Sequence, residues 1–99
     1  MTDQSIEFLL ELENIIQARI SEGGDASYTS RLVESGEKRV AQKVGEEAVE
    51  LVLAAAVGDR DEQISESADL LYHLLVLLSI KGIELAEVVS ALQERHRAR

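Results

Sequence analysis

Five acidic side chains stand within or beside the two most apolar stretches of this sequence. They are Glu46, Glu47, Glu50, Glu66 and Asp69. Glu50 is the only polar residue between Ala48 and Val57, and a carboxylate that is desolvated without a partner is unfavourable. Neither apolar stretch contains a Lys or Arg to neutralise these acids. A divalent cation is therefore the simplest partner, and Mg²⁺ or Mn²⁺ prefers oxygen ligands of this kind.

The spacing of four of these acids supports a shared metal site. Glu47 and Glu50 are three residues apart, as are Glu66 and Asp69, so each pair lies on one face of a helix. A short turn near Gly58 joins the two segments, and antiparallel packing would bring the four carboxylates together. We therefore predict that all four ligate the metal. The alternative is a solvated acidic face, which would carry balancing Lys residues at i+4 positions.

Two further side chains lie close to the acidic pattern. Lys43 precedes Glu47 by four residues, so it either binds a phosphate group held by the metal or forms an intrahelical ion pair with Glu47. His73 follows Asp69 by four residues on the same helix face. It either orients a carboxylate, contacts substrate, or is a partly buried structural histidine, which is the more frequent outcome.

The elements that position these residues are expected to be helices. The sequence contains no proline and only six glycines, and its apolar residues are mostly Leu, Val, Ile and Ala. Periodicity and capping residues predict long helices near 5–20, 37–57, 59–81 and 83–97 and a short helix near 27–35. Gly58 is expected at the C′ position of the second long helix, and Asp59 or Asp61 at the cap of the third. These features predict an all-α fold, an antiparallel helical bundle of four main helices plus one short helix.

Composition limits the classes of function. The 99 residues fit a single domain, 1–99, and a net charge of −9 argues against nucleic acid as a partner. An acidic protein can still bind a phosphorylated small molecule if metal ions bridge the two. No apolar stretch is long enough for a membrane span, and the N-terminus does not resemble a signal peptide. The absence of cysteine suits a cytoplasmic location.

The distribution of apolar residues predicts self-association. The segment from Leu70 to Leu78 places leucines around most of a helix, and Ala48 to Val57 is apolar on most sides. A helix that is apolar all round must be buried all round, and one small chain cannot enclose two such helices. We therefore expect a homodimer or a higher homo-oligomer.

Three segments resemble the phosphoribosyl-ATP pyrophosphohydrolase family: SYTSRL (27–32), KVGEEAVELVLAA (43–55) and ESADLLYHLLVLL (66–78). This family is part of the all-α nucleoside-triphosphate pyrophosphatase, or MazG-like, superfamily. The superfamily pattern EExxE followed by ExxD is matched by Glu46, Glu47, Glu50, Glu66 and Asp69. The resemblance implies Mg²⁺-dependent hydrolysis of 1-(5-phosphoribosyl)-ATP to 1-(5-phosphoribosyl)-AMP and pyrophosphate, the second step of L-histidine biosynthesis. It also implies a dimer or larger assembly with the active site near the subunit boundary. From the length of the chain we expect the stand-alone form rather than a fusion with a cyclohydrolase.

This reaction gives the predicted site residues their expected roles. Glu47, Glu50, Glu66 and Asp69 are the metal ligands, and Lys43 holds phosphate oxygens. Glu46 lies about 100° around the helix from Glu47 and is either a ligand of a second metal ion or the general base, so Glu46, Glu47 and Glu50 form the expected catalytic group. Two alternatives remain open. One is a housekeeping nucleoside-triphosphate pyrophosphatase, and the other is a non-enzymatic helical dimerisation or regulatory module.

Overall fold

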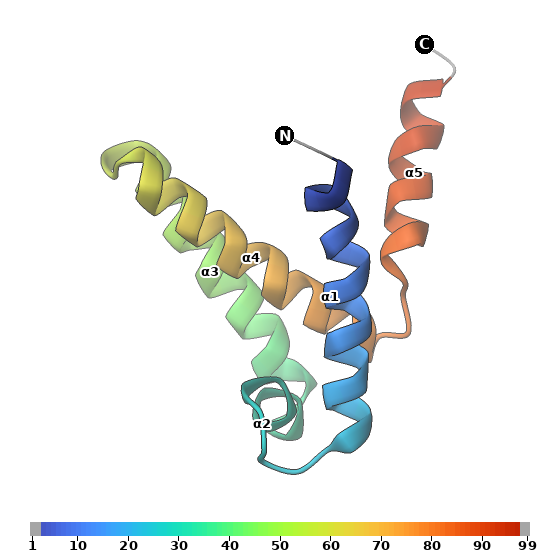
Figure 1. Cartoon of the computed structure of the whole chain (residues 1–99). Coiled ribbons are helices and arrows are strands. Elements are labelled where there is room, and N and C mark those ends of the chain that lie inside the picture. Colours follow the sequence, from blue (N-terminus) through green and yellow to red (C-terminus); the bar gives the residue numbers. More distant parts are fainter. Residues whose placement is uncertain (1–2, 98–99) are drawn as a thin grey trace.

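The computed structural model describes residues 3–97, which form five helices and contain no strand (Figure 1). In chain order the helices are α1 (Asp3–Glu22), α2 (Tyr28–Glu34), α3 (Glu37–Val57), α4 (Arg60–Ile80) and α5 (Leu85–Arg97). The predicted all-α class is confirmed, and the bounds of α3 agree with those predicted. None of these helices has an apolar stretch long enough to cross a membrane.

Local sequence sets the beginnings of α2 and α4. Ser27 caps α2, because its hydroxyl oxygen accepts the backbone N–H of Ser30 at 3.0 Å. Asp59 caps α4 in a reciprocal arrangement with Glu62. The Asp59 carboxylate accepts the backbone N–H of Glu62 at 2.9 Å, and the Glu62 carboxylate accepts that of Asp59 at 3.3 Å. Of the two predicted caps, Asp59 is therefore the correct one.

Gly58 ends α3, although the predicted C′ position was wrong. It occupies the C-cap position with an extended backbone, at φ −94° and ψ 175°. Its N–H donates to the carbonyl oxygen of Ala54 at 2.9 Å, and a Cβ at position 58 would lie 2.9 Å from that same oxygen. Glycine suits this position because the backbone approaches so closely, and not because a left-handed conformation is needed.

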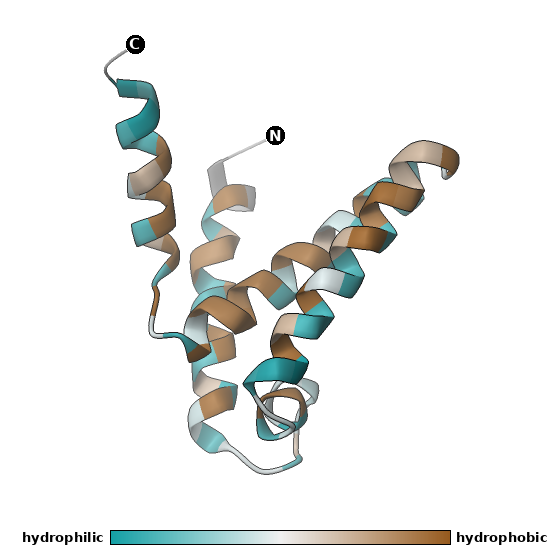
Figure 2. Ribbon diagram, turned by 180° about the vertical axis from the view of Figure 1, so that it is seen from behind, coloured by the Kyte–Doolittle hydropathy of each residue, from teal (hydrophilic) through white to brown (hydrophobic). Residues whose placement is uncertain are grey.

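Helices α3 and α4 form an antiparallel hairpin whose tip projects away from α1 and α5 (Figures 1 and 2). The hydrophobic core lies near the base of the hairpin, where α1 and α2 also pack. Its buried members are Ile16, Leu32, Val40, Leu75 and Val76. Because this core occupies only one end of the hairpin, the rest of α3 and α4 is covered on one side only, by the other helix of the pair.

Several large apolar side chains on the outer part of the hairpin are exposed to solvent. Val52 is 66% exposed and Val57 is 87% exposed. Other large apolar residues on this part are also exposed, namely Val49, Leu53, Ile64 and Leu71. Figure 2 shows the same feature as hydrophobic segments that continue toward the tip of the hairpin. We refer to these six residues as the outer hairpin face.

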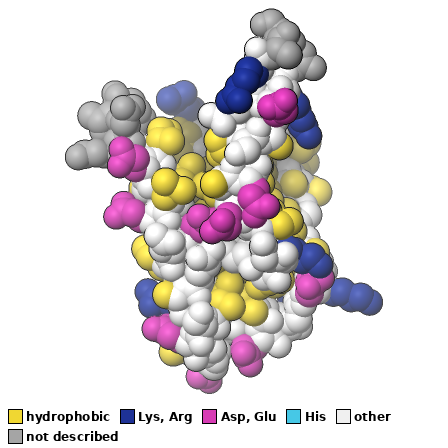
Figure 3. Space-filling view, turned by 90° about the vertical axis from the view of Figure 1, so that its right-hand side faces the viewer, with side chains coloured by type: hydrophobic (Ala, Val, Ile, Leu, Met, Phe, Trp, Pro, Cys, Tyr) yellow, Lys and Arg dark blue, Asp and Glu magenta, His cyan; other side chains and the backbone are white. Residues whose placement is uncertain are grey.

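Helix α5 returns beside α1 and is anchored by a buried carboxylate. Glu13 of α1 is only 8% exposed, and its Oε2 accepts the backbone N–H of Leu85 at 2.6 Å. Leu85 is the first residue of α5, where N–H groups lack intrahelical partners and a negative charge is favourable. Farther along, α1 and α5 border a largely apolar cleft of about 680 Å³, and hydrophobic side chains are visible on this side of the molecule (Figure 3).

Replacing Glu13 with alanine is expected to loosen α5. The change leaves the N–H of Leu85 without its acceptor, which should lower the free energy of unfolding by about 1–3 kcal/mol. Urea denaturation measures this loss, and hydrogen exchange should accelerate in residues 85–97. Glu11→Ala is the matched control, since Glu11 is exposed on the same helix. Equal effects of the two substitutions would contradict the anchoring role.

Candidate functional site

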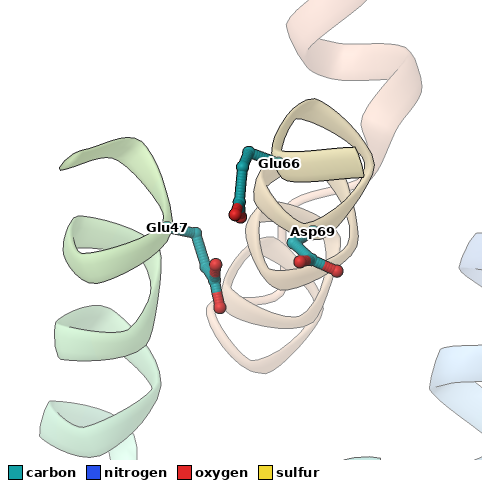
Figure 4. A group of neighbouring side chains, drawn as sticks. All are labelled: Glu47, Glu66 and Asp69. Carbon is teal, nitrogen blue, oxygen red and sulfur yellow. The ribbon is translucent and has the colours of Figure 1, made fainter. Parts of the chain in front are cut away.

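Three of the four predicted metal ligands meet between α3 and α4. Glu47 of α3 and Glu66 and Asp69 of α4 each offer a carboxylate oxygen, and these oxygens lie within 4.8 Å of one another (Figure 4). Glu47 is buried, Glu66 is half-buried and Asp69 is exposed. The group therefore opens from the interior of the hairpin toward its surface. We refer to these three residues as the carboxylate cluster.

One oxygen of the cluster indicates that a cation fits there. Glu47 is only 5% exposed, and its Oε1 is buried without a hydrogen bond to any part of the chain that the structure describes. Such an oxygen is costly, because almost all buried polar atoms in proteins have a partner. Carboxylate oxygens are the ligands that hard divalent cations prefer. The cluster can thus hold a metal ion, and that ion would give Glu47 Oε1 its missing partner.

Glu50, the fourth predicted ligand, lies beside the cluster and not within it. Its side chain is exposed, so the sequence was misleading in suggesting that Glu50 is the desolvated acid. The apolar residues around Glu50 in the sequence are themselves largely exposed. The pKa of Glu50 is raised, because hydrogen bonding with Glu47 and the negative charges of Glu47 and Glu66 favour its protonated form. Glu50 is therefore close enough to interact with two cluster members.

Glu47 is held in its ionised form by its neighbours. Burial acts to raise its pKa, but hydrogen bonding with Glu50 and Lys43 and the charge of Lys43 outweigh burial, so the pKa is lowered. Lys43 Nζ lies 3.3 Å from Glu47 Oε2, and this contact is the main reason why the pKa of Lys43 is raised. Of the two alternatives for Lys43, the structure contains the intrahelical ion pair. Its contact with phosphate remains a prediction.

Glu46 is not part of the carboxylate cluster. It is exposed, and its carboxylate lies 3.5 Å from Arg39 and 3.9 Å from Lys43. Together with Gly45, Val49 and Glu50 it lines an open hollow of about 600 Å³ on the surface of α3. Its predicted role as a second metal ligand or general base is left open by this position.

Two aromatic side chains next to the cluster, those of Tyr28 and His73, contact each other. The imidazole of His73, which is 5% exposed, lies with Nε2 2.7 Å from the Tyr28 hydroxyl. Its Nδ1 is 2.7 Å from the backbone carbonyl oxygen of Asp69 and 3.9 Å from Glu47 Oε2. Sequence reasoning left the role of His73 open and gave Tyr28 no role at the site. Tyr28 is 45 residues away, so no local spacing could reveal it, and the only signal was its presence in the SYTSRL segment.

The raised pKa of Glu50 predicts how the metal-free protein responds to pH. A carboxyl whose pKa is higher in the folded protein than in the unfolded chain stabilises the fold at low pH, and this contribution is lost as pH rises through the folded pKa. Stability in EDTA should therefore fall less between about pH 4 and pH 7 in Glu50→Gln than in the unmodified protein. Urea denaturation over that pH range is the measurement. A steeper fall in the variant would contradict the assignment.

Comparison with known proteins identifies the family. Residues 9–96 match the family model described as phosphoribosyl-ATP pyrophosphohydrolase. The protein named histidine biosynthesis bifunctional protein HisIE from Vibrio vulnificus is 50% identical over 95 residues, which cover 96% of this chain and 45% of the relative. Proteins of the same name from Campylobacter jejuni and Escherichia coli K12 are 53% and 51% identical, over 92% and 91% of this chain and 44% of each relative. The chain spans less than half the length of these curated relatives. It belongs to the phosphoribosyl-ATP pyrophosphohydrolase family.

Proposed function

We propose that this chain hydrolyses 1-(5-phosphoribosyl)-ATP to 1-(5-phosphoribosyl)-AMP and pyrophosphate, the second step of L-histidine biosynthesis. Membership of the family supports this substrate and this reaction. The bifunctional relatives carry histidine biosynthesis in their names, and the proposal concerns only the part of them that this chain matches, within one domain at residues 1–99. The structural observation that carries the proposal is the buried, unpartnered oxygen of Glu47, whose carboxylate lies together with those of Glu66 and Asp69.

The carboxylate cluster is the proposed site of Mg²⁺, for which Mn²⁺ can substitute. When bound, the ion neutralises phosphate charge and lowers the pKa of a coordinated water molecule. Glu47, Glu66 and Asp69 would hold it, and Glu50 would complete the ligand set from its position beside them. Because the pKa of Glu47 is lowered, this side chain is ionised at neutral pH and needs no deprotonation before it ligates the metal.

Two other residues have proposed roles at the edge of the cluster. The ammonium of Lys43 lies beside Glu47, at the right place to attract phosphate oxygens toward the cluster. Glu46 borders the same surface hollow as Glu50, and there it can accept a proton from the attacking water or bind a second metal ion. Neither role requires a covalent bond between protein and substrate, because phosphoryl transfer depends mainly on positioning and charge stabilisation.

The outer hairpin face supports a homodimer as the working form. It contains six exposed apolar residues on α3 and α4, and a second copy of the chain would remove them from water. Leu53 and Val57 also line a hollow of about 230 Å³ together with Glu50 and Glu66. The apolar face and the acidic residues are therefore continuous, and this continuity supports an active site close to the subunit boundary of the proposed dimer. A small-molecule substrate, no nucleic-acid partner and a cytoplasmic location complete the proposal.

An assay of the purified protein tests the function. Pyrophosphate release from phosphoribosyl-ATP should require Mg²⁺ and stop when EDTA is added, and Mg²⁺ should raise the melting temperature of the protein. The control substrate is dATP. Equal cleavage of dATP would favour the housekeeping pyrophosphatase, whereas cleavage of neither substrate, with no thermal response to Mg²⁺, would favour the non-enzymatic module.

A further inference from the structure

We infer that Tyr28 and His73 are positioning residues for the metal ligands, with Tyr28 acting through His73 to fix the geometry of Glu47 and Asp69. This inference rests on the proposed metal site in the carboxylate cluster. It assigns a role at that site to α2, a helix that contributes no carboxylate to the cluster.

The directions of the hydrogen bonds follow from the partners. The backbone carbonyl of Asp69 can only accept, so the Nδ1 atom of His73, 2.7 Å away, must carry a proton and donate it. In a neutral imidazole Nε2 is then the acceptor, and the Tyr28 hydroxyl, also at 2.7 Å, is the donor. The pKa of Tyr28 is raised, mainly by burial, so its hydroxyl keeps this proton at neutral pH. Two consecutive hydrogen bonds therefore run from the Tyr28 hydroxyl through the His73 imidazole to the backbone carbonyl of Asp69.

The imidazole has little freedom to turn away from the cluster. It is buried, and the rings of Tyr28 and Tyr72 meet it edge to face, with centroids 5.7 Å and 5.3 Å away. Its Nδ1 edge faces Glu47 Oε2 at 3.9 Å while it holds the backbone of Asp69. One ring thus touches a ligand of α3 and a ligand of α4. Neighbours that hold the ligands of a metal ion in place raise the affinity of the site for the ion.

A neighbouring hydrogen bond offers a matched control. The hydroxyls of Thr29 and Tyr72 also join α2 to α4, one residue along each helix from Tyr28 and His73. This second bond does not involve His73, the residue that contacts Glu47 and Asp69. If α2 served only to support the fold, the loss of either hydrogen bond would have the same effect on metal binding. If Tyr28 positions the ligands, only its loss should affect the metal.

The test measures Mn²⁺ affinity by electron paramagnetic resonance in Tyr28→Phe and Tyr72→Phe, each of which removes one hydroxyl and keeps the ring. Tyr28→Phe should weaken Mn²⁺ binding about 10-fold, while Tyr72→Phe should leave it nearly unchanged. Melting temperatures in EDTA should fall by similar amounts in both variants. A double variant, Tyr28→Phe with His73→Asn, should bind Mn²⁺ no more weakly than His73→Asn alone, because Tyr28 acts through the imidazole.

The outcomes separate this inference from the proposed function. Equal Mn²⁺ affinities in Tyr28→Phe and Tyr72→Phe, with normal binding by the unmodified protein, would overturn the positioning role and leave the metal site standing. Additive losses in the double variant would also overturn it, since Tyr28 would then act independently of His73. Failure of the unmodified protein to bind Mn²⁺ would overturn the metal site, and the positioning role with it.

Discussion

Glu47→Gln is expected to reduce Mg²⁺-dependent pyrophosphate release by about 10³-fold or more. A bound cation contributes several kcal/mol of charge stabilisation to phosphoryl transfer, and each 1.36 kcal/mol corresponds to a factor of ten in rate. Glu47 is the only buried member of the carboxylate cluster. Glutamine keeps its volume but removes the charge, and it can turn an NH₂ group toward the metal position or toward the ammonium of Lys43.

The loss of turnover in Glu47→Gln should come with the loss of metal binding and not with unfolding. The variant should keep its helical circular dichroism spectrum, while its melting temperature should no longer rise when Mg²⁺ is added. Glu94→Gln is the control, because Glu94 is an exposed acid on α5, outside the carboxylate cluster. Near-normal turnover in Glu47→Gln, with an intact response to Mg²⁺, would show that the cluster does not hold the catalytic ion.

The protein is expected to form a homodimer that Val52→Glu dissociates. Light scattering should give about twice the 10.9 kDa chain mass for the unmodified protein, or a multiple of that value. Val52 is 66% exposed on the outer hairpin face, and a glutamate there would place an unpaired charge in the interface. The variant should therefore have the mass of a single chain.

A second glutamate substitution on α3, outside the outer hairpin face, is the control for adding a negative charge to this helix. Gln42 is exposed on α3 and is not part of the outer hairpin face, so Gln42→Glu should remain dimeric. Dissociation should also lower turnover, since Leu53 and Val57 line the hollow beside Glu50 and Glu66. A well-folded monomer of the unmodified protein would disprove both the packing prediction and the location of the site at a subunit boundary.

The sequence alone was sufficient for several local features of this protein. The bounds of α3 and the three-residue spacing of Glu66 and Asp69 depend on neighbours within one or two helical turns. A short turn between α3 and α4 then leaves few arrangements other than an antiparallel hairpin. For these reasons the all-α class and the meeting of carboxylates from two helices could be predicted from the sequence.

Tertiary structure decided which of these acids is buried and which side chains from distant parts of the sequence lie next to it. The apolar run around Glu50 indicated burial there. Four of its large apolar residues instead belong to the outer hairpin face, and Glu50 is exposed while Glu47 is buried. The contact between Tyr28 and His73 joins residues 45 positions apart. Helical periodicity fixes where side chains lie on their own helix. Burial and long-range contacts depend instead on how whole helices pack, and that packing sets the environment of Glu47.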